Sequence, residues 1–316
     1  METWDTAGRR PAEQYPYWRE VICQAFTTLN PVAEARSSFH GSVSRKQLLD
    51  VTVSQVSSGA QSVYRGPREI RATRGTEYFF ANMQMRGQCV VRQDGREVLI
   101  RPGDFYVVDT TRPYDLIFGD WSLLCIRIPR ATLLPALRNP RAATAVRLCD
   151  DGGMGSITGA YLRSLVQCPE TLPVSQQRAL VDSLTALLAN TLGATEETLE
   201  NGRAAVRRGT HDAVLRHIEA RLAEPGLSTA AVAAHFRVSA RYLQLLLEEH
   251  GQSFQRHVVE RRLARCAAEL ACPGSRAPVS EIAQRWGFAN FSSFCRVFRA
   301  RYGVAANEYR AGAGAH

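Results

Sequence analysis

The sequence contains no long hydrophobic run. None of its 316 residues falls in a stretch that approaches the ~20 uncharged apolar residues of a membrane-spanning helix. The N-terminal segment from Met1 to Arg10 also lacks the apolar core of a signal peptide. These absences predict a cytoplasmic protein with no membrane partner.

Metal-binding and catalytic patterns are also missing. The eight cysteines are scattered without a Cys-x-x-Cys motif, and no cysteine–histidine cluster has the spacing of a zinc site. No Ser/His/Asp or Cys/His set of catalytic type is present either. The sequence therefore predicts free thiols, no cofactor, no metal site and no enzymatic activity.

Lysine is almost absent, because Lys46 is the only one among 39 basic residues. The net charge is nevertheless +9, with a pI near 9.4. Such an excess suits a polyanionic partner, since each basic side chain near a phosphate releases condensed counterions on binding. Charge alone does not identify that partner as nucleic acid.

The first 130 residues are dominated by strand signals, and the chain is long enough for two domains. Asp94-Gly95 between two apolar stretches predicts a hairpin, and Pro102-Gly103-Asp104 predicts a second tight turn. We expect an antiparallel sheet or barrel. The predicted strands are Leu48 to Val56, Tyr78 to Arg86, Gln88 to Gln93, Val98 to Ile100, Phe105 to Asp109 and Trp121 to Ile128.

Helical periodicity replaces this pattern from Ser156 and predicts a helical hairpin over about 156–192. Its second helix carries a continuous leucine stripe, which either covers the sheet or forms a dimer surface. We expect the stripe to support a homodimer. The proposed dimer residues are Leu184, Leu187, Leu188 and Leu192.

A polar segment without sustained periodicity, residues 193–209, follows the hairpin and predicts a linker. The predicted domains are therefore residues 1–192, for sensing and dimerisation, and residues 210–316. Within the second domain, Val214, Leu215, Ile218 and Leu222 predict an amphipathic helix that ends near Pro225.

Two segments of the second domain resemble one another. Val232, Ala233 and Phe236 match Ile282, Ala283 and Trp286 at an offset of fifty, whereas Leu243 and Leu247 match Phe294 and Phe298 at fifty-one. One residue is thus inserted at the second turn. Small residues where two helices cross, serines suited to N-caps (Ser228 and Ser280) and Gly287 in a turn together predict two helix-turn-helix units.

A third helix, from about Ser253 to Ala271, is predicted to connect the two units. Its apolar face holds Phe254, Val258, Leu263, Ala267 and Leu270. This rod of about 27 Å could place two recognition helices near ~34 Å apart, one turn of B-DNA. Between Gly209 and Ala311, 14 arginines and nine acidic residues give a charge of +5. Those on the connecting and last recognition helices are Arg256, Arg261, Arg262, Arg265, Arg296, Arg299 and Arg301.

The region from Thr210 to Arg310 resembles the AraC/XylS family of transcription regulators. It departs from the family pattern at Ala306, where proline is usual, at Arg237, where the turn often has glycine, and at Leu247, where an aromatic is usual. The residues that carry the resemblance are Arg262-Leu263, Ala267, Leu270, Ile282-Ala283, Gly287-Phe288, Phe294 to Arg299, Tyr302-Gly303 and Glu308-Tyr309-Arg310.

The resemblance implies double-stranded DNA as a partner, RNA polymerase as a second, and a nucleoid-associated location. Arginine can pair bidentately with guanine and glutamine with adenine, which favours Arg241, Gln244 and Arg296 as base-reading residues. The full set implied by the resemblance is Arg241, Gln244 and Leu245 in the first unit and Phe291, Ser292, Ser293 and Arg296 in the second.

The segment from Gly95 to Val108 is similar to the cupin-like sensor barrel of this family, and Asp109 to Tyr114 strengthens the likeness. His40 is the only histidine before His211, so a metal-dependent cupin enzyme is not expected. A small organic effector, aromatic or carboxylate-bearing, is expected in the barrel, with a ligand-free dimerisation barrel as the alternative. The candidate lining residues are the aromatics Tyr64, Tyr78, Phe80 and Tyr106, with the arginines Arg65, Arg71 and Arg86.

These observations predict an α+β protein: an N-terminal cupin-like antiparallel β-barrel with a helical hairpin, then an all-α domain with two helix-turn-helix units. The expected function is sequence-specific DNA binding by an effector-responsive activator of a catabolic or metabolic operon. A metal-free cupin-like enzyme with a DNA-binding tail and an architectural nucleic-acid-binding protein are the alternatives.

Overall fold

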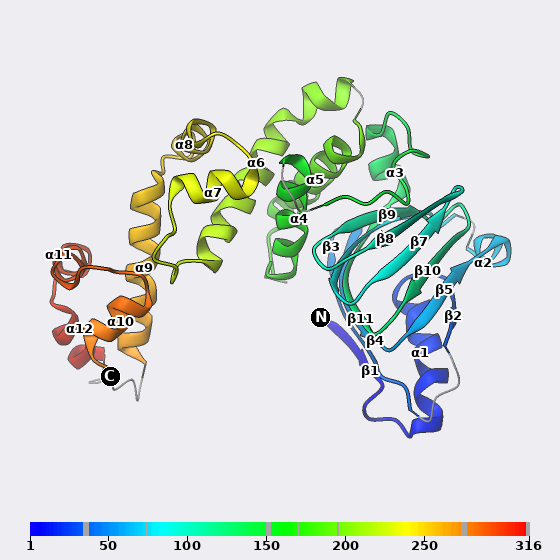
Figure 1. Ribbon diagram of the computed structural model, residues 1–316, viewed down its shortest axis with the longest axis horizontal. Helices are drawn as coiled ribbons and strands as arrows, with labels where there is room; N and C mark the ends of the chain where they lie inside the picture. The colour runs from blue at the N-terminus through cyan, green and yellow to red at the C-terminus, as the bar shows by residue number, and fades with distance from the viewer. Residues whose placement is uncertain are drawn as a thin grey trace. The chain divides into compact units, whose positions relative to one another are not determined.

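Two antiparallel β-sheets form the centre of the first part of the chain (Figure 1). One has the strand order β1-β3-β4-β11-β6-β9 and the other β2-β5-β10-β7-β8. The strands are β1 (Glu2–Asp5), β2 (Asn30–Val32), β3 (Gly41–Leu48), β4 (Val51–Ser58), β5 (Gln61–Arg65), β6 (Tyr78–Arg86), β7 (Cys89–Gln93), β8 (Arg96–Ile100), β9 (Phe105–Asp109), β10 (Tyr114–Phe118) and β11 (Trp121–Pro129).

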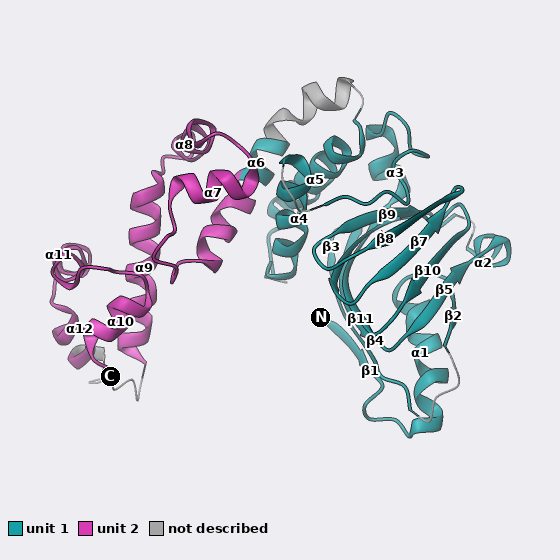
Figure 2. Cartoon of the chain, viewed as in Figure 1, with its two compact units in different colours: residues 1–210 teal, residues 211–316 magenta. Residues whose placement is uncertain are grey.

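The computed structural model describes residues 1–33, 38–73, 75–149, 153–169, 171–194, 196–272 and 277–313, and describes side chains outside 196–205 and 312–313. The chain divides into two compact units, Met1–Thr210 and His211–His316 (Figure 2). We call the first the sensor unit and the second the DNA-binding unit, after the roles that the family resemblance implies for them.

Turn chemistry decides where the strands end. Asp94 and Gly95 both have positive φ, 54° and 75°, and join β7 to β8 in the predicted two-residue hairpin. The predicted single strand from Leu48 to Val56 is wrong, however. Leu49 adopts φ 55° and reverses the chain between β3 and β4, which pair along their whole length. No sign of this turn is visible in the sequence, because the last residue of β3, Leu48, and the first of β4, Val51, are both apolar and buried.

Helix α1 (Pro11–Ala25) lies against the sheets, in a region where the sequence indicated only strands (Figure 1). It buries Trp18, Val21 and Ile22 in the core of the sensor unit. Gly41 makes room for this helix, because a Cβ there would lie 2.4 Å from the Trp18 ring. The indole nitrogen of Trp18 donates to Gln61 Oε1 at 3.1 Å, so the buried indole is paired.

The predicted helical hairpin is present as α4 (Gly153–Val166) and α5 (Val174–Leu192). Its leucine stripe corrects the dimer assignment. Leu184, Leu187 and Leu188 are at most 1% exposed within the single chain, because α5 packs against α4 and against Gly209. The stripe therefore lies in the interior, in line with the alternative that this helix covers other parts of the chain. Those three side chains are not available to a second subunit. Leu192 is half-buried.

The segment expected as a linker is mostly helical, because α6 runs from Glu196 to Ala220. The remaining helices of the sensor unit are short: α2 (Pro67–Ala72), α3 (Arg130–Leu133) and the 3-10 turn η1 (Leu134–Ala136). Among the described helices, none combines the length and apolarity needed to cross a bilayer.

The DNA-binding unit is helical throughout its described regular elements. Its elements are the end of α6, then α7 (Thr229–Phe236), α8 (Ala240–Glu248), α9 (Phe254–Ala271), α10 (Val279–Arg285), α11 (Phe291–Tyr302) and α12 (Ala306–Ala313). An antiparallel sheet fold with a helical hairpin, followed by an all-helical domain, confirms the predicted α+β class.

Candidate DNA-binding interface and effector cavity

The two predicted helix-turn-helix units are the pairs α7–α8 and α10–α11. Side-chain caps start three of these helices: Ser228, Ser239 and Asn290 each accept a hydrogen bond from a first-turn amide. Ser280 is not a cap as predicted. Helix α10 begins at Val279 after Pro278, so Ser280 lies inside its first turn. Pro278 supplies the extended backbone that precedes the helix.

Left-handed backbone makes the turn of each unit. Gly287 has φ 81°, as the sequence indicated. Arg237 occupies the corresponding turn with φ 49°, although it carries a side chain. The departure from glycine thus leaves the geometry intact at the cost of some backbone strain. Leu247, the other departure in this unit, is fully buried in place of an aromatic ring.

The predicted base-reading residues of the first unit lie on the exposed face of α8. Arg241 and Gln244 are exposed, and Leu245 is 45% exposed, which is unusual for a leucine. The opposite face of the same helix is buried through Leu243 and Leu246. The helix therefore separates a core face from a face open to a partner.

The second unit repeats this division on α11. Phe294 and Phe298 are fully buried, while Phe291 is 46% exposed and Arg296 is exposed. Ser292 and Ser293 are also exposed. Helix α9 connects the two units, and α8 and α11 are both seen nearly end-on in Figure 1. Two exposed helices carried by one connecting helix suit two successive major grooves.

The connecting helix α9 matches its predicted bounds and buries the predicted apolar face. Its arginines, however, mostly bind within the chain. Arg261 and Arg265 both donate to Glu219 on α6, at distances of 2.6–3.1 Å. Hydrogen bonding from Arg261 holds the pKa of the Glu219 carboxyl below its ordinary value. These two charges therefore tie α6 to α9 and contribute less to a phosphate-binding face than the sequence indicated.

Arg262 joins the two helix-turn-helix units. Its guanidinium donates three hydrogen bonds of 2.8 Å, to the carbonyl oxygens of Leu222, Glu224 and Gly287. Leu222 and Glu224 precede the first unit, whereas Gly287 is the turn of the second. A Cβ on Gly287 would lie 2.6 Å from the guanidinium, so a side chain there would displace the guanidinium from these carbonyls. Sequence reasoning missed this role because the contacts span up to 40 residues.

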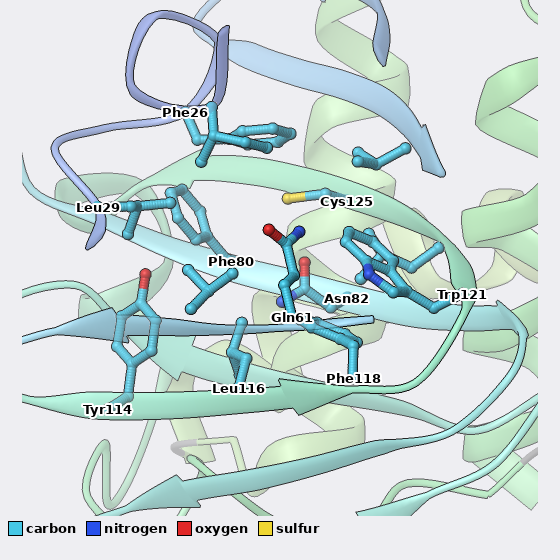
Figure 3. A pocket seen from close by; sticks show the side chains of 14 residues that line it. Phe26, Leu29, Gln61, Phe80, Asn82, Tyr114, Leu116, Phe118, Trp121 and Cys125 are labelled. Atoms are coloured by element: carbon cyan, nitrogen blue, oxygen red, sulfur yellow. The ribbon is translucent and has the colours of Figure 1, made fainter. Parts of the chain in front are cut away.

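A cavity lies in the sensor unit between α1 and the two sheets (Figure 3). Its volume is about 50 Å³, and it opens to solvent. Its surface is almost entirely apolar. The lining residues are Ile22, Phe26, Leu29, Val56, Gln61, Val63, Phe80, Asn82, Tyr114, Leu116, Phe118, Trp121, Leu123 and Cys125.

Of the four aromatic residues expected to line a ligand site, only Phe80 lines this cavity. Tyr64 is 39% exposed on β5, and Tyr78 packs with Arg127 over its ring. Tyr106 is fully buried, and its hydroxyl lies 3.8 Å from Cys89 Sγ. Alternation along β5 puts Tyr64 on the face opposite Gln61 and Val63. Tyr78 and Tyr106 share the sheet face of Phe80 and Asn82 but lie outside the cavity lining.

Two buried thiols of the sensor unit, Cys89 and Cys125, are held in the protonated form. Cys125, predicted as a core residue, is 3% exposed, and burial raises its pKa to about 12. Burial likewise raises the pKa of Cys89 to about 12. Within the described residues, no group of three or more histidine, cysteine or acidic side chains is arranged to hold a metal ion.

Residues 18–193 match the AraC-binding-like domain family, and residues 232–312 match a helix-turn-helix domain family. A sheet fold with a cavity followed by two recognition helices on one connecting helix defines a DNA-binding transcription regulator. The chain belongs to the AraC family, and it is a regulator rather than an enzyme.

Several curated proteins are similar to the chain. The transcriptional activator NphR of Rhodococcus sp is 27% identical over 284 residues, which cover 88% of this chain and 82% of NphR. The transcriptional activator RhrA of Rhizobium meliloti (strain 1021) is 29% identical, covering 57% and 54%. An uncharacterized protein in the nit 5' region of Bacillus sp. (strain OxB-1) is 34% identical, covering 42% and 52%. The chain thus spans about half the length of the last two.

The crystal structure of the AraC-like transcriptional activator CuxR has a similar fold. The TM-score is 0.54 at 15% sequence identity, and the match covers 90% of this chain and 99% of CuxR. The shared fold includes both the sheet region and the helical region, given that coverage.

Proposed function

We propose that this regulator is an effector-responsive transcriptional activator whose α8 and α11 read operator DNA. The observation that carries the proposal is the exposure of the whole predicted base-reading set on two helices whose other faces are buried. The proposed contacts are Arg241, Gln244 and Leu245 on α8 and Phe291, Ser292, Ser293 and Arg296 on α11.

The chemistry of these side chains suits the major groove. Arg241 and Arg296 can donate bidentately to guanine O6 and N7, and Gln244 can pair with adenine N6 and N7. Leu245 and Phe291 are large exposed apolar groups that suit a thymine methyl. Because one chain carries both helices, each subunit is proposed to contact two successive grooves on one face of the duplex.

The biological setting is proposed from the family and from named relatives. NphR and RhrA are named transcriptional activators, which supports recruitment of RNA polymerase at a catabolic or metabolic operon. The cavity of the sensor unit supports a small organic effector. A cytoplasmic, nucleoid-associated location follows from chromosomal DNA as the partner.

A homodimer is also proposed, although the buried leucines Leu184, Leu187 and Leu188 cannot form its surface. Other positions of the α4–α5 hairpin would have to carry it. Sedimentation of the full chain at tens of micromolar measures this directly. A purely monomeric species would contradict the dimer.

To test the function, the full-length protein is used to select duplexes from a pool of random sequences, and the enriched duplexes are then footprinted. We expect a preferred sequence with two major-groove contacts about 10 base pairs apart for each subunit. Inserting five base pairs between them turns one contact to the opposite face, so tight binding should be lost. A folded protein that enriches no sequence would instead indicate an architectural nucleic-acid-binding protein.

A further inference from the structure

Two buried hydrogen-bond donors of the cavity have no acceptor. The Tyr114 hydroxyl and the Trp121 indole N–H are without a partner among the described residues, and the side chains are only 2% and 3% exposed. Both residues line the cavity. Figure 3 shows them toward opposite ends of the lining, with Gln61 and Asn82 between them.

Such unpaired groups are rare in folded proteins, because a buried donor without an acceptor loses its hydration and gains nothing in return. Trp18, in the same core, has its indole N–H paired with Gln61. Gln84 Oε1 and Arg127 Nε of the sensor unit are also without a partner among the described residues, but neither residue lines the cavity. The Tyr114 and Trp121 donors, in contrast, belong to the lining of a cavity whose unfilled space could hold acceptors from outside the chain.

The charge of the cavity restricts the ligand further. Its lining contains no arginine, lysine, histidine or carboxylate. The buried guanidinium of Arg65, which acts electrostatically on Tyr114, donates instead to the carbonyls of Thr110 and Thr28 and to the Thr73 hydroxyl. A carboxylate buried in the cavity would therefore have no hydrogen-bonded cationic partner in the lining, at a large desolvation cost.

The donors keep their protons at neutral pH. Burial raises the pKa of the Tyr114 phenol well above its ordinary value, and burial raises that of the neighbouring Cys125 thiol to about 12. The Tyr114 hydroxyl therefore remains a neutral donor, like the indole of Trp121.

We propose that this cavity binds a neutral, mainly apolar organic molecule with two hydrogen-bond acceptor groups, one for the Tyr114 hydroxyl and one for the Trp121 indole N–H. The inference rests on the proposed effector-responsive function and names the chemical class of the effector. It replaces the broader expectation of an aromatic or carboxylate-bearing compound with a neutral one.

Matched small probes test the class on the full-length protein by calorimetry. The panel is 1,4- and 1,3-dimethoxybenzene, with two neutral acceptors at different separations, 1,4-diethylbenzene, with none, and 4-methoxybenzoate, with a charge. We expect a diether to bind about tenfold more tightly than the hydrocarbon, from the pairing of two donors, and more tightly than the benzoate. Equal binding of the hydrocarbon, tightest binding of the benzoate, or no binding of any probe would overturn the proposal.

Conservative variants locate the contacts. Tyr114→Phe removes only the hydroxyl, and Trp121→Phe removes the indole N–H. Each should weaken the diether about fivefold and leave the hydrocarbon nearly unchanged. Tyr64→Phe is the control, because Tyr64 lies outside the cavity lining. The melting temperature of ligand-free Tyr114→Phe should stay the same or rise, since an unpaired polar group is removed. A lower melting temperature with unchanged diether affinity would show a structural role instead.

Failure of this inference is separable from failure of the proposed function. The same probes are added to cells in which the selected operator drives a reporter. A carboxylate that activates the reporter would preserve the effector-responsive function and refute the neutral class. Diethers that bind the purified protein without changing reporter output would support the ligand class and count against the regulatory role.

Discussion

The DNA-binding unit and the sensor unit place their functional side chains by different means. In α8 and α11 the functional residues belong to single helices of nine and 12 residues, so periodicity alone separates exposed from buried positions. The cavity of the sensor unit instead takes side chains from α1 and from strands β4, β5, β6, β10 and β11. Its site exists only after strands distant in sequence have paired.

This difference teaches which kind of change each unit should tolerate. In the helical unit, exposed and buried positions alternate within one short segment, so neighbouring substitutions should separate affinity from stability. In the sensor unit a lining residue is also a core residue, as Phe80 and Cys125 show. Most cavity substitutions there should change both properties together.

The largest effect should come from Phe298→Ala, which empties a fully buried position in the DNA-binding unit. We expect a loss of about 3–5 kcal/mol in the free energy of unfolding of that unit, since a cavity remains. Denaturation followed by circular dichroism measures it. Phe291→Ala is the matched control, because that ring is 46% exposed. Equal loss in both variants would break the division of α11 into two faces.

Arg262→Met should remove the link between the two helix-turn-helix units. Three backbone carbonyls lose their donor, and we expect about 1–3 kcal/mol lower stability. Affinity for a two-groove site should fall more than affinity for a single-groove site, because the units are no longer held in register. Arg256→Met is the control, since Arg256 pairs only within α9, with Glu260. Identical losses on both sites would refute the linking role.

Arg296→Ala should weaken DNA binding by about 1–3 kcal/mol and relax preference at one operator position, without unfolding the protein. Its comparison is Arg299→Ala, another exposed arginine of α11, which we expect to contact phosphate and to weaken all sequences alike. Binding to single-base operator variants distinguishes the two. Unchanged discrimination by Arg296→Ala would contradict its base-reading role.

Ala306→Pro should stabilise the DNA-binding unit slightly. Ala306 is the first residue of α12, a position that favours proline because its N–H has no acceptor within the helix. We expect a gain of about 0.4–1 kcal/mol, mainly from lower entropy of the unfolded chain. Thermal melting is the measurement. A loss of stability would show that the 7% exposed site has no room for the ring.

The smallest expected effect is the loss of stability of the DNA-binding unit at acidic pH. Burial, with a further contribution from Arg261, lowers the pKa of His257 below 6.5. The folded unit then favours the neutral ring. The stability that neutral His257 contributes is complete above pH 6.5 and is lost as the pH falls below that value. His257→Gln should flatten this part of the pH profile in urea titrations. An unchanged profile would assign the acid sensitivity to other groups.

Much of the DNA-binding unit follows from sequence because its signals are local. The caps Ser228 and Ser239, the turn at Gly287 and the buried Phe294 each depend on residues within a few positions. Ser280 failed as a cap for a local reason too, since Pro278 starts the helix two residues earlier. The arginines of α9 could not be placed, because their partners lie up to 46 residues away.

The sequence by itself determined the class of this protein. It predicted two helix-turn-helix units and an antiparallel sheet domain, and its short contiguous motifs carried the family resemblance. Only the tertiary structure decided that Leu184, Leu187 and Leu188 are interior and that Arg262 joins the two helix-turn-helix units. It also decided that Tyr114 and Trp121 line a cavity and have no hydrogen-bond partner among the described residues. The physical reason is the range of the interactions. Helix periodicity and turns act over a few residues, whereas burial and hydrogen-bond satisfaction depend on every segment that packs nearby.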